Sequence, residues 1–254
     1  MKAVNAASAV VPCVSHEQAM ALISEGLHDP LFGQIRSAHV QLCPQHCGYL
    51  HEATLERLID AYPNTQFRLH ASPKLKGEGR AIVYASNLHE ERAYLARMVA
   101  MTRLMGSSGY SIHAGRRDQN TLSGMIDNAK LLEDAMGTRT SVEGLYPTPR
   151  NTWLMSDWEE YEAVLRAGIG FALDLSHLNI LVRRQGRRDD LVKEMIASPA
   201  CVEVHISHND GRADSHLPLD PASPPWWYDM LELTHAEAEL FYEGVLVLPA
   251  KTKR

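Results

Sequence analysis

Twelve residues of this 254-residue chain hold an unusual density of metal-binding side chains. The segment reads His205-Ile-Ser-His208-Asn-Asp-Gly-Arg212-Ala-Asp214-Ser-His216, with three histidines and two aspartates. It directly follows the short, mostly apolar run Cys201-Val-Glu-Val204, which is typical of a buried strand. Imidazoles and carboxylates in a glycine-containing loop after a buried strand are how a barrel builds a metal site. The segment therefore predicts metal ligation.

The same residue types recur at the ends of five successive predicted strands. With the ligands that the following loops add, the set is His70, His113, Glu143, Asp174, His177, His205, Asp214 and His216. Taken singly, each has an ordinary explanation, such as a hydrogen-bonded histidine or a helix cap. Together they would place many costly charges at one edge, and a divalent cation offsets that cost. The joint occurrence therefore predicts a metal centre.

Strand-like and helix-like segments alternate along the chain with little left over. The predicted strands cover 40–42, 67–70, 110–113, 140–143, 171–174, 202–205 and 245–248. The predicted helices cover 52–61, 90–105, 120–136, 156–167, 189–197 and 225–234, the fourth starting with a capping box over 156–159. Such alternation indicates a parallel α/β sheet, and no nucleotide-binding glycine motif follows any strand. We expect one domain over 1–254, a (β/α)8 TIM barrel.

The eighth strand is the uncertain element of this barrel. Little chain remains after 245–248, so the N-terminal extension 1–35 has to supply it. We expect a strand over 9–14 and a helix over 16–26, although Pro12 weakens the strand. We therefore expect an eight-stranded barrel that is irregular or incomplete at the eighth strand.

Composition narrows the function classes. The net charge of −6 disfavours a generally basic nucleic-acid-binding surface, and no apolar run is long enough to cross a membrane. Because the N-terminus lacks the apolar run of a signal peptide, we expect a cytoplasmic protein. The run Cys43-Pro-Gln-His46-Cys47 is either a metal or redox pair or a loop with reduced thiols, and its spacing favours the loop.

In order and spacing, the predicted ligands resemble those of the endonuclease IV type of apurinic-site nuclease, within the xylose isomerase-like TIM-barrel superfamily. The resemblance runs from about 40 to 248. It implies a first ion on His70, His113 and Glu143, and a second, bridged by Glu143, on Asp174 and His205. The third ion would be held by His177, Asp214 and His216. Such a cluster implies zinc, with manganese or iron also compatible by ligand type.

One departure from the family weakens this assignment. The family carries a glutamate at the end of the seventh strand, whereas the predicted strand 245–248 is followed by Pro249. Glu243 precedes that strand and would lie at the wrong end of the barrel. This departure counts most against the sugar isomerase interpretation, because in the isomerases of the superfamily this glutamate is both a metal ligand and the proton-transfer base. It leaves a centre of two or three ions.

We interpret the chain as a metal-dependent hydrolase of a small-molecule or nucleic-acid phosphoester, with metal-activated water as nucleophile. Glu143, His208 and Arg212 are the expected catalytic residues, the last two by contact with substrate. The basic segments 116–117 and 183–188 suit an anionic substrate. Alternatively, 183–188 is simply a solvated loop that pairs with Asp189 and Asp190. The alternatives are a sugar isomerase or epimerase, a multinuclear iron oxidase, and a barrel that binds metal without turnover. The sequence does not give substrate or oligomeric state.

Overall fold

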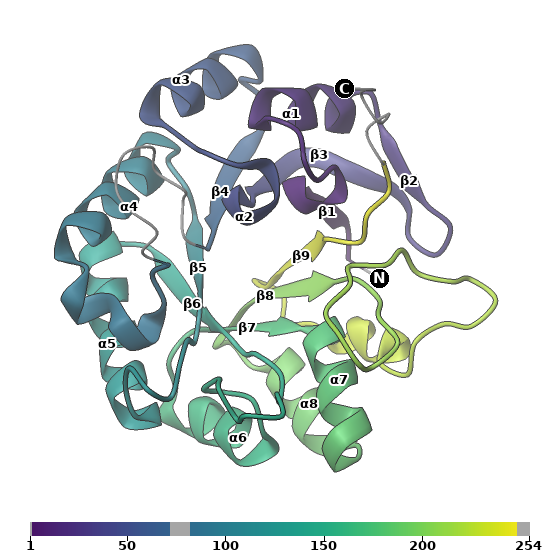
Figure 1. Ribbon diagram of the computed structural model, residues 1–254. Helices are drawn as coiled ribbons and strands as arrows, with labels where there is room; N and C mark the ends of the chain where they lie inside the picture. Colours follow the sequence, from purple (N-terminus) through teal and green to yellow (C-terminus); the bar gives the residue numbers. More distant parts are fainter. Residues whose placement is uncertain (1, 72–81, 248–254) are drawn as a thin grey trace.

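The computed structural model describes residues 2–71 and 82–247. Its centre is a closed ring of eight parallel strands, drawn in Figure 1 with the helices around it. The ring closes because the first strand pairs in parallel with both the last strand and β3. The strands of the ring are β1 (Val4–Ala7), β3 (Gly33–Leu42), β4 (Gln66–His70), β5 (Gly109–His113), β6 (Arg139–Glu143), β7 (Phe171–Asp174), β8 (Cys201–Ile206) and β9 (Glu239–Tyr242). The predicted TIM barrel is confirmed.

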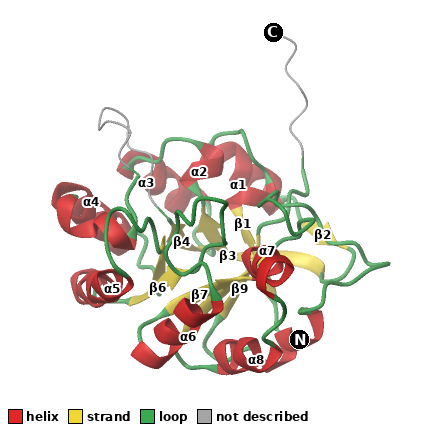
Figure 2. Cartoon of the chain, turned by 60° about the horizontal axis from the view of Figure 1, so that its bottom comes forward, coloured by secondary structure: helices red, strands yellow, loops and turns green. Residues whose placement is uncertain are grey.

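Helices surround the ring of strands, as the tilted view of Figure 2 shows. They are α1 (His16–Ser24), α2 (Pro44–Cys47), α3 (Glu52–Ala61), α4 (Arg92–Leu104), α5 (Leu122–Met136), α6 (Trp158–Ala167), α7 (Leu175–Gln185) and α8 (Asp189–Ala197). One extra strand, β2 (Leu27–Asp29), forms an antiparallel hairpin with β3 outside the ring. Within the described ranges, no helix is both long and apolar enough to cross a membrane.

Local capping explains where several helices begin and end. The Thr121 side chain accepts a hydrogen bond from the Gly124 backbone N–H at the start of α5, and Gly137 ends that helix in the left-handed conformation. Helix α6 begins at Trp158, two residues later than predicted, because Asp157 rather than Ser156 caps it by accepting from the Glu160 N–H. These caps fix the ends of helices that the apolar pattern had located.

The chain's N-terminal segment does supply the eighth strand, but at a different place. The strand covers Val4–Ala7, whereas Ser8–Val10 form a 3-10 helix. The prediction over 9–14 was wrong in position, because Val4, Asn5 and Ala6 have partners in β9 and the later residues do not.

The last strand is also displaced from its prediction, with consequences for the site. It is β9 (Glu239–Tyr242), paired with β8 and β1, and 245–247 are not strand. The Val245 N–H donates to the His216 carbonyl, while those of Leu246 and Val247 donate to the Val10 carbonyl. These residues are therefore bonded to two different segments rather than to a neighbouring strand. Pro249 lies outside the described residues.

Two helical segments differ from the prediction. Helix α7 was not predicted, because the Asp174-to-His177 segment suggested ligands in a loop, whereas Asp174 caps a helix there. The segment predicted as a helix over 225–234 is the 3-10 helix η3 (Tyr228–Leu233), preceded by prolines that restrict the backbone. A further 3-10 helix, η2 (Ala85–Glu90), precedes α4.

Candidate metal centre

The carboxyl ends of the ring strands surround a cavity of about 230 Å³. In a parallel barrel these ends meet at one mouth, so residues distant in sequence converge there. The described residues that line the cavity are Gln45, His46, His70, His113, Glu143, Asp174, His177, Asp214, His216 and Glu243. Seven of the eight predicted metal ligands are in that lining, and the eighth, His205, lies directly beneath it, within 3.5 Å of Glu143.

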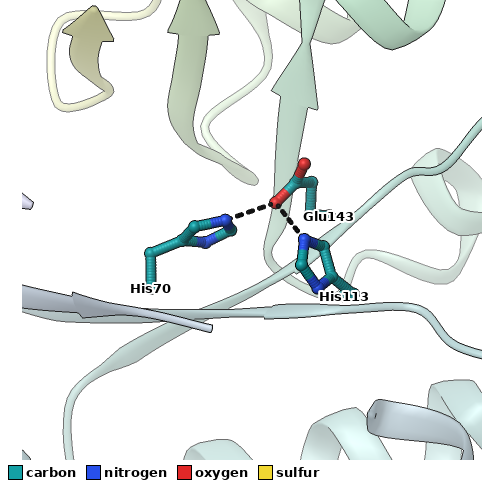
Figure 3. A group of neighbouring side chains, drawn as sticks. All are labelled: His70, His113 and Glu143. Carbon is teal, nitrogen blue, oxygen red and sulfur yellow. Dashed lines mark ion pairs between the residues drawn. The ribbon is translucent and has the colours of Figure 1, made fainter. Parts of the chain in front are cut away.

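Glu143, at the end of β6, is the centre of the cluster. Its Oε2 lies 3.1 Å from His70 Nε2 and 3.5 Å from His113 Nε2, the two contacts drawn in Figure 3. The same oxygen lies 3.5 Å from His205 Nδ1, while Oε1 lies 3.4 Å from His177 Nδ1. The two carboxylate oxygens thus face different histidines, as a carboxylate shared between two ion positions would.

A ninth donor, missed from the sequence, completes the ring of ligand types. Glu243 follows β9 directly and is 3 % exposed, with Oε1 3.7 Å from His205 Nδ1 and Oε2 3.7 Å from His216 Nδ1. Ligand atoms of Asp174, His205 and Glu243 all lie within 4.8 Å of one another. The inference that the last strand lacks its glutamate, and that Glu243 lies at the wrong end, was therefore wrong. It depended on placing the strand at 245–248.

Asp214 joins the remaining predicted ligands. Its Oδ2 lies 3.2 Å from His177 Nε2 and 3.3 Å from His216 Nε2. Asp174 serves two purposes: Oδ1 accepts from the Ser176 and His177 backbone N–H groups, and Oδ2 lies 3.5 Å from His177 Nε2. The cap of α7 therefore holds one carboxylate in the mouth and starts the helix that carries His177.

The outer nitrogens of three histidines are fixed by partners outside the cluster. His70 Nδ1 shares a hydrogen bond of 3.0 Å with Ser111 Oγ, and His177 Nδ1 donates to the Gly144 carbonyl at 2.8 Å. His205 Nε2 lies 2.9 Å from the Glu203 carboxylate. Each contact leaves the other ring nitrogen facing the mouth. Metal-binding histidines in proteins are oriented in the same way.

Orphaned polar atoms test whether these residues fit a cation. Glu143 Oε2, His205 Nδ1, His216 Nδ1 and Glu243 Oε1 are buried and have no hydrogen-bond partner. Such atoms are costly unless something satisfies them. All four belong to ligand types and lie among one another at the mouth. The donor set therefore fits one or more divalent cations.

The electrostatics of the cluster point the same way. Burial lowers the pKa of His205, but the carboxylates of Glu243 and Glu143 outweigh burial and raise that pKa well above its ordinary value. Burial raises the pKa of Glu243 to about 7, reinforced by the Asp174 and Glu143 carboxylates and opposed by the His205 and His216 imidazoles. Excess negative charge in a buried site produces both shifts, and a cation would relieve it.

His208 and Arg212, predicted to contact substrate, do not line the cavity in the described part of the chain. The His208 backbone pairs with that of Leu217 and holds the base of the loop that carries Asp214 and His216. Arg212 is exposed, and its Nε lies 3.8 Å from Asp210 Oδ2. Their predicted catalytic roles stay predictions.

The basic runs have partners of their own. Arg117 donates to Glu160 at 2.5 and 2.8 Å, and Arg116 pairs with Asp118 at 2.6 Å. In the run 183–188, Arg187 pairs with Asp189 at 2.6 Å. The solvated, paired interpretation of these residues therefore fits the structure better than a substrate role.

The motif over 43–47 forms the short helix α2 at the edge of the mouth. Cys43 and Cys47 are free and buried, and the Cys47 thiol donates to the Ser8 carbonyl at 3.4 Å. Burial raises the pKa of both thiols, which disfavours thiolate chemistry. Gln45 and His46 line the cavity, and the His46 ring lies 4.9 Å from that of His216. The reduced-thiol interpretation agrees with this structure.

Comparison with known proteins extends the fold assignment. No protein-family model and no curated protein matches the chain. Among solved structures, a D-tagatose 3-epimerase-like protein superposes with a TM-score of 0.67 at 14 % identity, covering 96 % of this chain and 92 % of that one. An AP endonuclease, family 2, from Brucella melitensis gives 0.66 at 16 % identity, covering 99 % and 95 %.

A third structure, the IolI protein with a binding zinc atom, gives a TM-score of 0.62 at 12 % identity and covers 98 % of this chain and 90 % of that one. Identities this low carry the architecture and not the reaction. The chain therefore has the fold of the xylose isomerase-like TIM-barrel proteins.

Proposed function

We propose that the protein is a divalent-metal hydrolase of a phosphoester, acting with two or three ions at the mouth of the barrel. The observation that carries the proposal is the donor set: five histidines and four carboxylates contact one another there. A zinc ion in proteins takes about four ligands, so nine donors exceed what one ion uses.

Residue chemistry divides these donors among ion positions. His70, His113 and Glu143 would hold one ion, and Asp174, His205 and Glu243, with Glu143 shared, a second. His177, Asp214 and His216 would hold a third, because Asp214 contacts both imidazoles. Bound divalent ions at such sites supply Lewis acidity and lower the pKa of water. Zinc suits these ligands, and the zinc in the IolI structure supports the same choice.

The number of ions decides which substrate the site attracts. The four mouth carboxylates have no lysine or arginine partner among the described residues, so added cations set the local charge. With the four carboxylates ionised and the metal-bound imidazoles neutral, one divalent ion leaves the site net negative, which repels a phosphate and suits a neutral sugar. Two neutralise it, and three make it net positive, which favours an anionic phosphoester.

Cavity size limits what enters. The cavity of about 230 Å³ is smaller than the roughly 300–1,000 Å³ of typical small-molecule sites. A phosphoryl group with one attached residue fits that space. The remainder of a larger substrate, including a nucleic acid, would stay outside the mouth.

A second function has specific support. Glu143, Asp174, His205 and Glu243 alone make a complete one-ion site, and Glu243 restores the acidic residue whose absence counted against an isomerase or epimerase. Epimerases are prominent among the structural neighbours. With one ion, the protein would instead be a sugar epimerase, with the other histidines and Asp214 left to orient substrate.

Metal stoichiometry and two substrate classes distinguish the proposals. Protein purified without chelator is analysed for metal per chain. It is then assayed on bis(p-nitrophenyl) phosphate, an oligonucleotide with an abasic site, and D-tagatose. We expect two or three zinc ions per chain and phosphodiester cleavage, with both lost in Glu143→Gln. One ion per chain with epimerisation of the sugar and no cleavage would reject the hydrolase.

A further inference from the structure

A second polar layer lies beneath the metal-binding mouth, inside the ring of strands. Arg68 lies two residues before His70 on β4, and Glu203 two residues before His205 on β8. Because strand side chains alternate, each pair points to the same side, here the barrel interior. Arg68, Glu203 and Gln41 of β3 are 2 %, 0 % and 0 % exposed. The proposed hydrolase or epimerase reaction uses none of them.

The three side chains form a hydrogen-bonded network around one carboxylate, in which Gln41 Oε1 and Arg68 Nε have no partner. Arg68 Nη1 donates to Glu203 Oε2 at 2.6 Å, and Gln41 Nε2 donates to Glu203 Oε1 at 3.0 Å. His205 Nε2 lies 2.9 Å from that same Oε1. Arg68 is held in turn by the Ser108 hydroxyl at 3.1 Å and by the Phe241 ring beneath its guanidinium. Glu203 is therefore immobilised with one oxygen aimed at a metal-ligand histidine.

This network decides which nitrogen of His205 carries the proton. An ionised carboxylate only accepts, so the 2.9 Å contact with Glu203 requires a proton on His205 Nε2. Gln41 Nε2 also lies 3.2 Å from His205 Nε2, and both nitrogens lie within 3.0 Å of the same Glu203 oxygen, which accepts from both. Reversing the Gln41 amide would place its oxygen against the Glu203 carboxylate, so the amide nitrogen stays there. With Nε2 protonated, Nδ1 carries the lone pair, and Nδ1 is the atom near Glu143 and Glu243.

We propose that Glu203 is a positioning residue for the metal centre: it holds His205 in the tautomer and orientation in which Nδ1 binds the cation, and Arg68 and Gln41 hold Glu203 for that purpose. The inference rests on the metal centre of the proposed function, but not on which reaction occurs there. Arg68 also neutralises the carboxylate. Glu203 is thereby kept from acting as a ligand itself, although it lies with His70 and His205 in a ligand-like group.

Two double variants isolate the hydrogen bond from the ion pair. Arg68→Met with Glu203→Gln keeps an acceptor for His205 but removes both charges. Arg68→Met with Glu203→Met removes the acceptor as well, in a side chain of similar length. Neither leaves an uncompensated buried charge, which would destabilise the protein by itself. The variants therefore differ in the group offered to His205 Nε2.

The readout is zinc affinity by chelator competition, together with the absorption spectrum of the Co²⁺-substituted protein. We expect the Met/Met variant to bind its weakest-held ion about 10- to 100-fold less tightly than wild type, the usual effect of losing an outer partner. The Met/Gln variant should stay near wild type and keep the Co²⁺ spectrum. Equal losses in both would overturn the proposal, because that is the result expected if Glu203 itself binds the ion.

A control and a direct measurement cover variants that fold poorly. Glu160 is also buried and paired with an arginine, Arg117, but contacts no ligand, so Glu160→Gln should lower thermal stability without changing zinc affinity. In the zinc-bound wild type, ¹⁵N-resolved NMR of the histidine rings should show His205 protonated at Nε2 only. A proton at Nδ1 instead would overturn the proposal whatever the variants do. If the wild-type protein binds two or three ions tightly but cleaves no phosphodiester, the proposed function is rejected and the role of Glu203 is not.

Discussion

The two ends of the barrel differ in how their charged side chains are paired. Below the mouth, Glu203 has Arg68 at 2.6 Å, and at the amino end the Lys2 ammonium donates to three backbone carbonyls at 2.6–2.8 Å. At the mouth, carboxylates and imidazoles lie 3.1–3.7 Å apart, and several of their atoms have no hydrogen-bond partner. These charges have partners within the chain, whereas the mouth carboxylates contact histidines and have no lysine or arginine partner among the described residues.

The difference separates a structural polar group from a functional one. Both layers are buried, and both contain titratable residues at alternate positions of the same strands. Unsatisfied atoms occur in both layers, because Gln41 Oε1 and Arg68 Nε are also buried without a hydrogen-bond partner. Among the described residues, the mouth differs in that its carboxylates have no lysine or arginine partner, whereas Glu203 has Arg68. Burial and unsatisfied atoms alone therefore do not identify the site; the excess of carboxylates over cationic partners does.

The variant with the largest expected effect removes the carboxylate that the ion positions at the mouth would share. Glu143→Gln takes away the group that four histidines face, so we expect loss of bound metal and a fall in activity beyond the roughly 10- to 100-fold that outer-shell changes cost. Elemental analysis and turnover measure both. The matched control is Glu239→Gln at the amino end, where normal metal content is expected. Metal loss in the control would contradict the division between the two ends.

Removing metal with a chelator should lower the free energy of unfolding, because the ions bound at the mouth stabilise the folded protein. At a free zinc concentration 1,000-fold above the dissociation constant, binding adds about 4 kcal/mol to the free energy of unfolding. For a chain of this size that corresponds to a rise in melting temperature of roughly 10 °C. Calorimetry with and without chelator measures the shift, which should vanish in Glu143→Gln. An equal shift in that variant would place the stabilising ion elsewhere.

His16 is a buried histidine outside the mouth, and its pKa shift differs from that of His205. His16 is 1 % exposed, and burial lowers its pKa to about 4, opposed by a weak contact with the Gly48 carbonyl. Between pH 6.5 and about 4 the unfolded chain binds a proton that the folded protein does not, so stability falls as pH falls. The loss should be on the order of 2–3 kcal/mol.

Denaturant unfolding at several pH values measures that loss, and His16→Gln should remove most of it. His28→Gln, which changes an exposed imidazole, is the control and should leave the acid dependence as it is in wild type. A wild-type slope unchanged by His16→Gln would show that other groups cause the acid loss.

The smallest expected effect is at the amino end. Lys2→Met removes an ammonium that donates to the carbonyls of His235, Ala236 and Ala238, and we expect a loss of about 1–2 kcal/mol in unfolding free energy. Zinc content and turnover should not change. A change in metal content would mean that the two ends are coupled through the barrel.

Much of the mouth was predictable because ligand types at strand ends converge in any parallel barrel. His70, His113 and Glu143 needed only the correct strand ends. Glu243 was missed because Val245-Leu-Val-Leu resembles a strand more than Glu239-Leu-Phe-Tyr does. What decides between them is pairing with β8 and β1, which strand propensity does not contain.

The lower layer had a signal in the sequence that was not used. Phe67-Arg-Leu-His70 and Val202-Glu-Val-His205 each place a charged residue two positions before a ligand histidine. In a strand that spacing puts both side chains on one face, so a contact between the arginine and the glutamate inside the barrel was predictable. The tautomer of His205 required distances that only the structure supplies.

The closing pair of the barrel has a consequence for biosynthesis. β1 is translated first and β9 last among the ring strands, and Asn5 pairs with Phe241 across almost the whole chain. During synthesis, the whole segment from β1 to β9 therefore has to leave the ribosome before the barrel can close, and Glu243 emerges only after β9. Any ion bound by the earlier histidines during synthesis would gain its last carboxylate only when β9 pairs with β1.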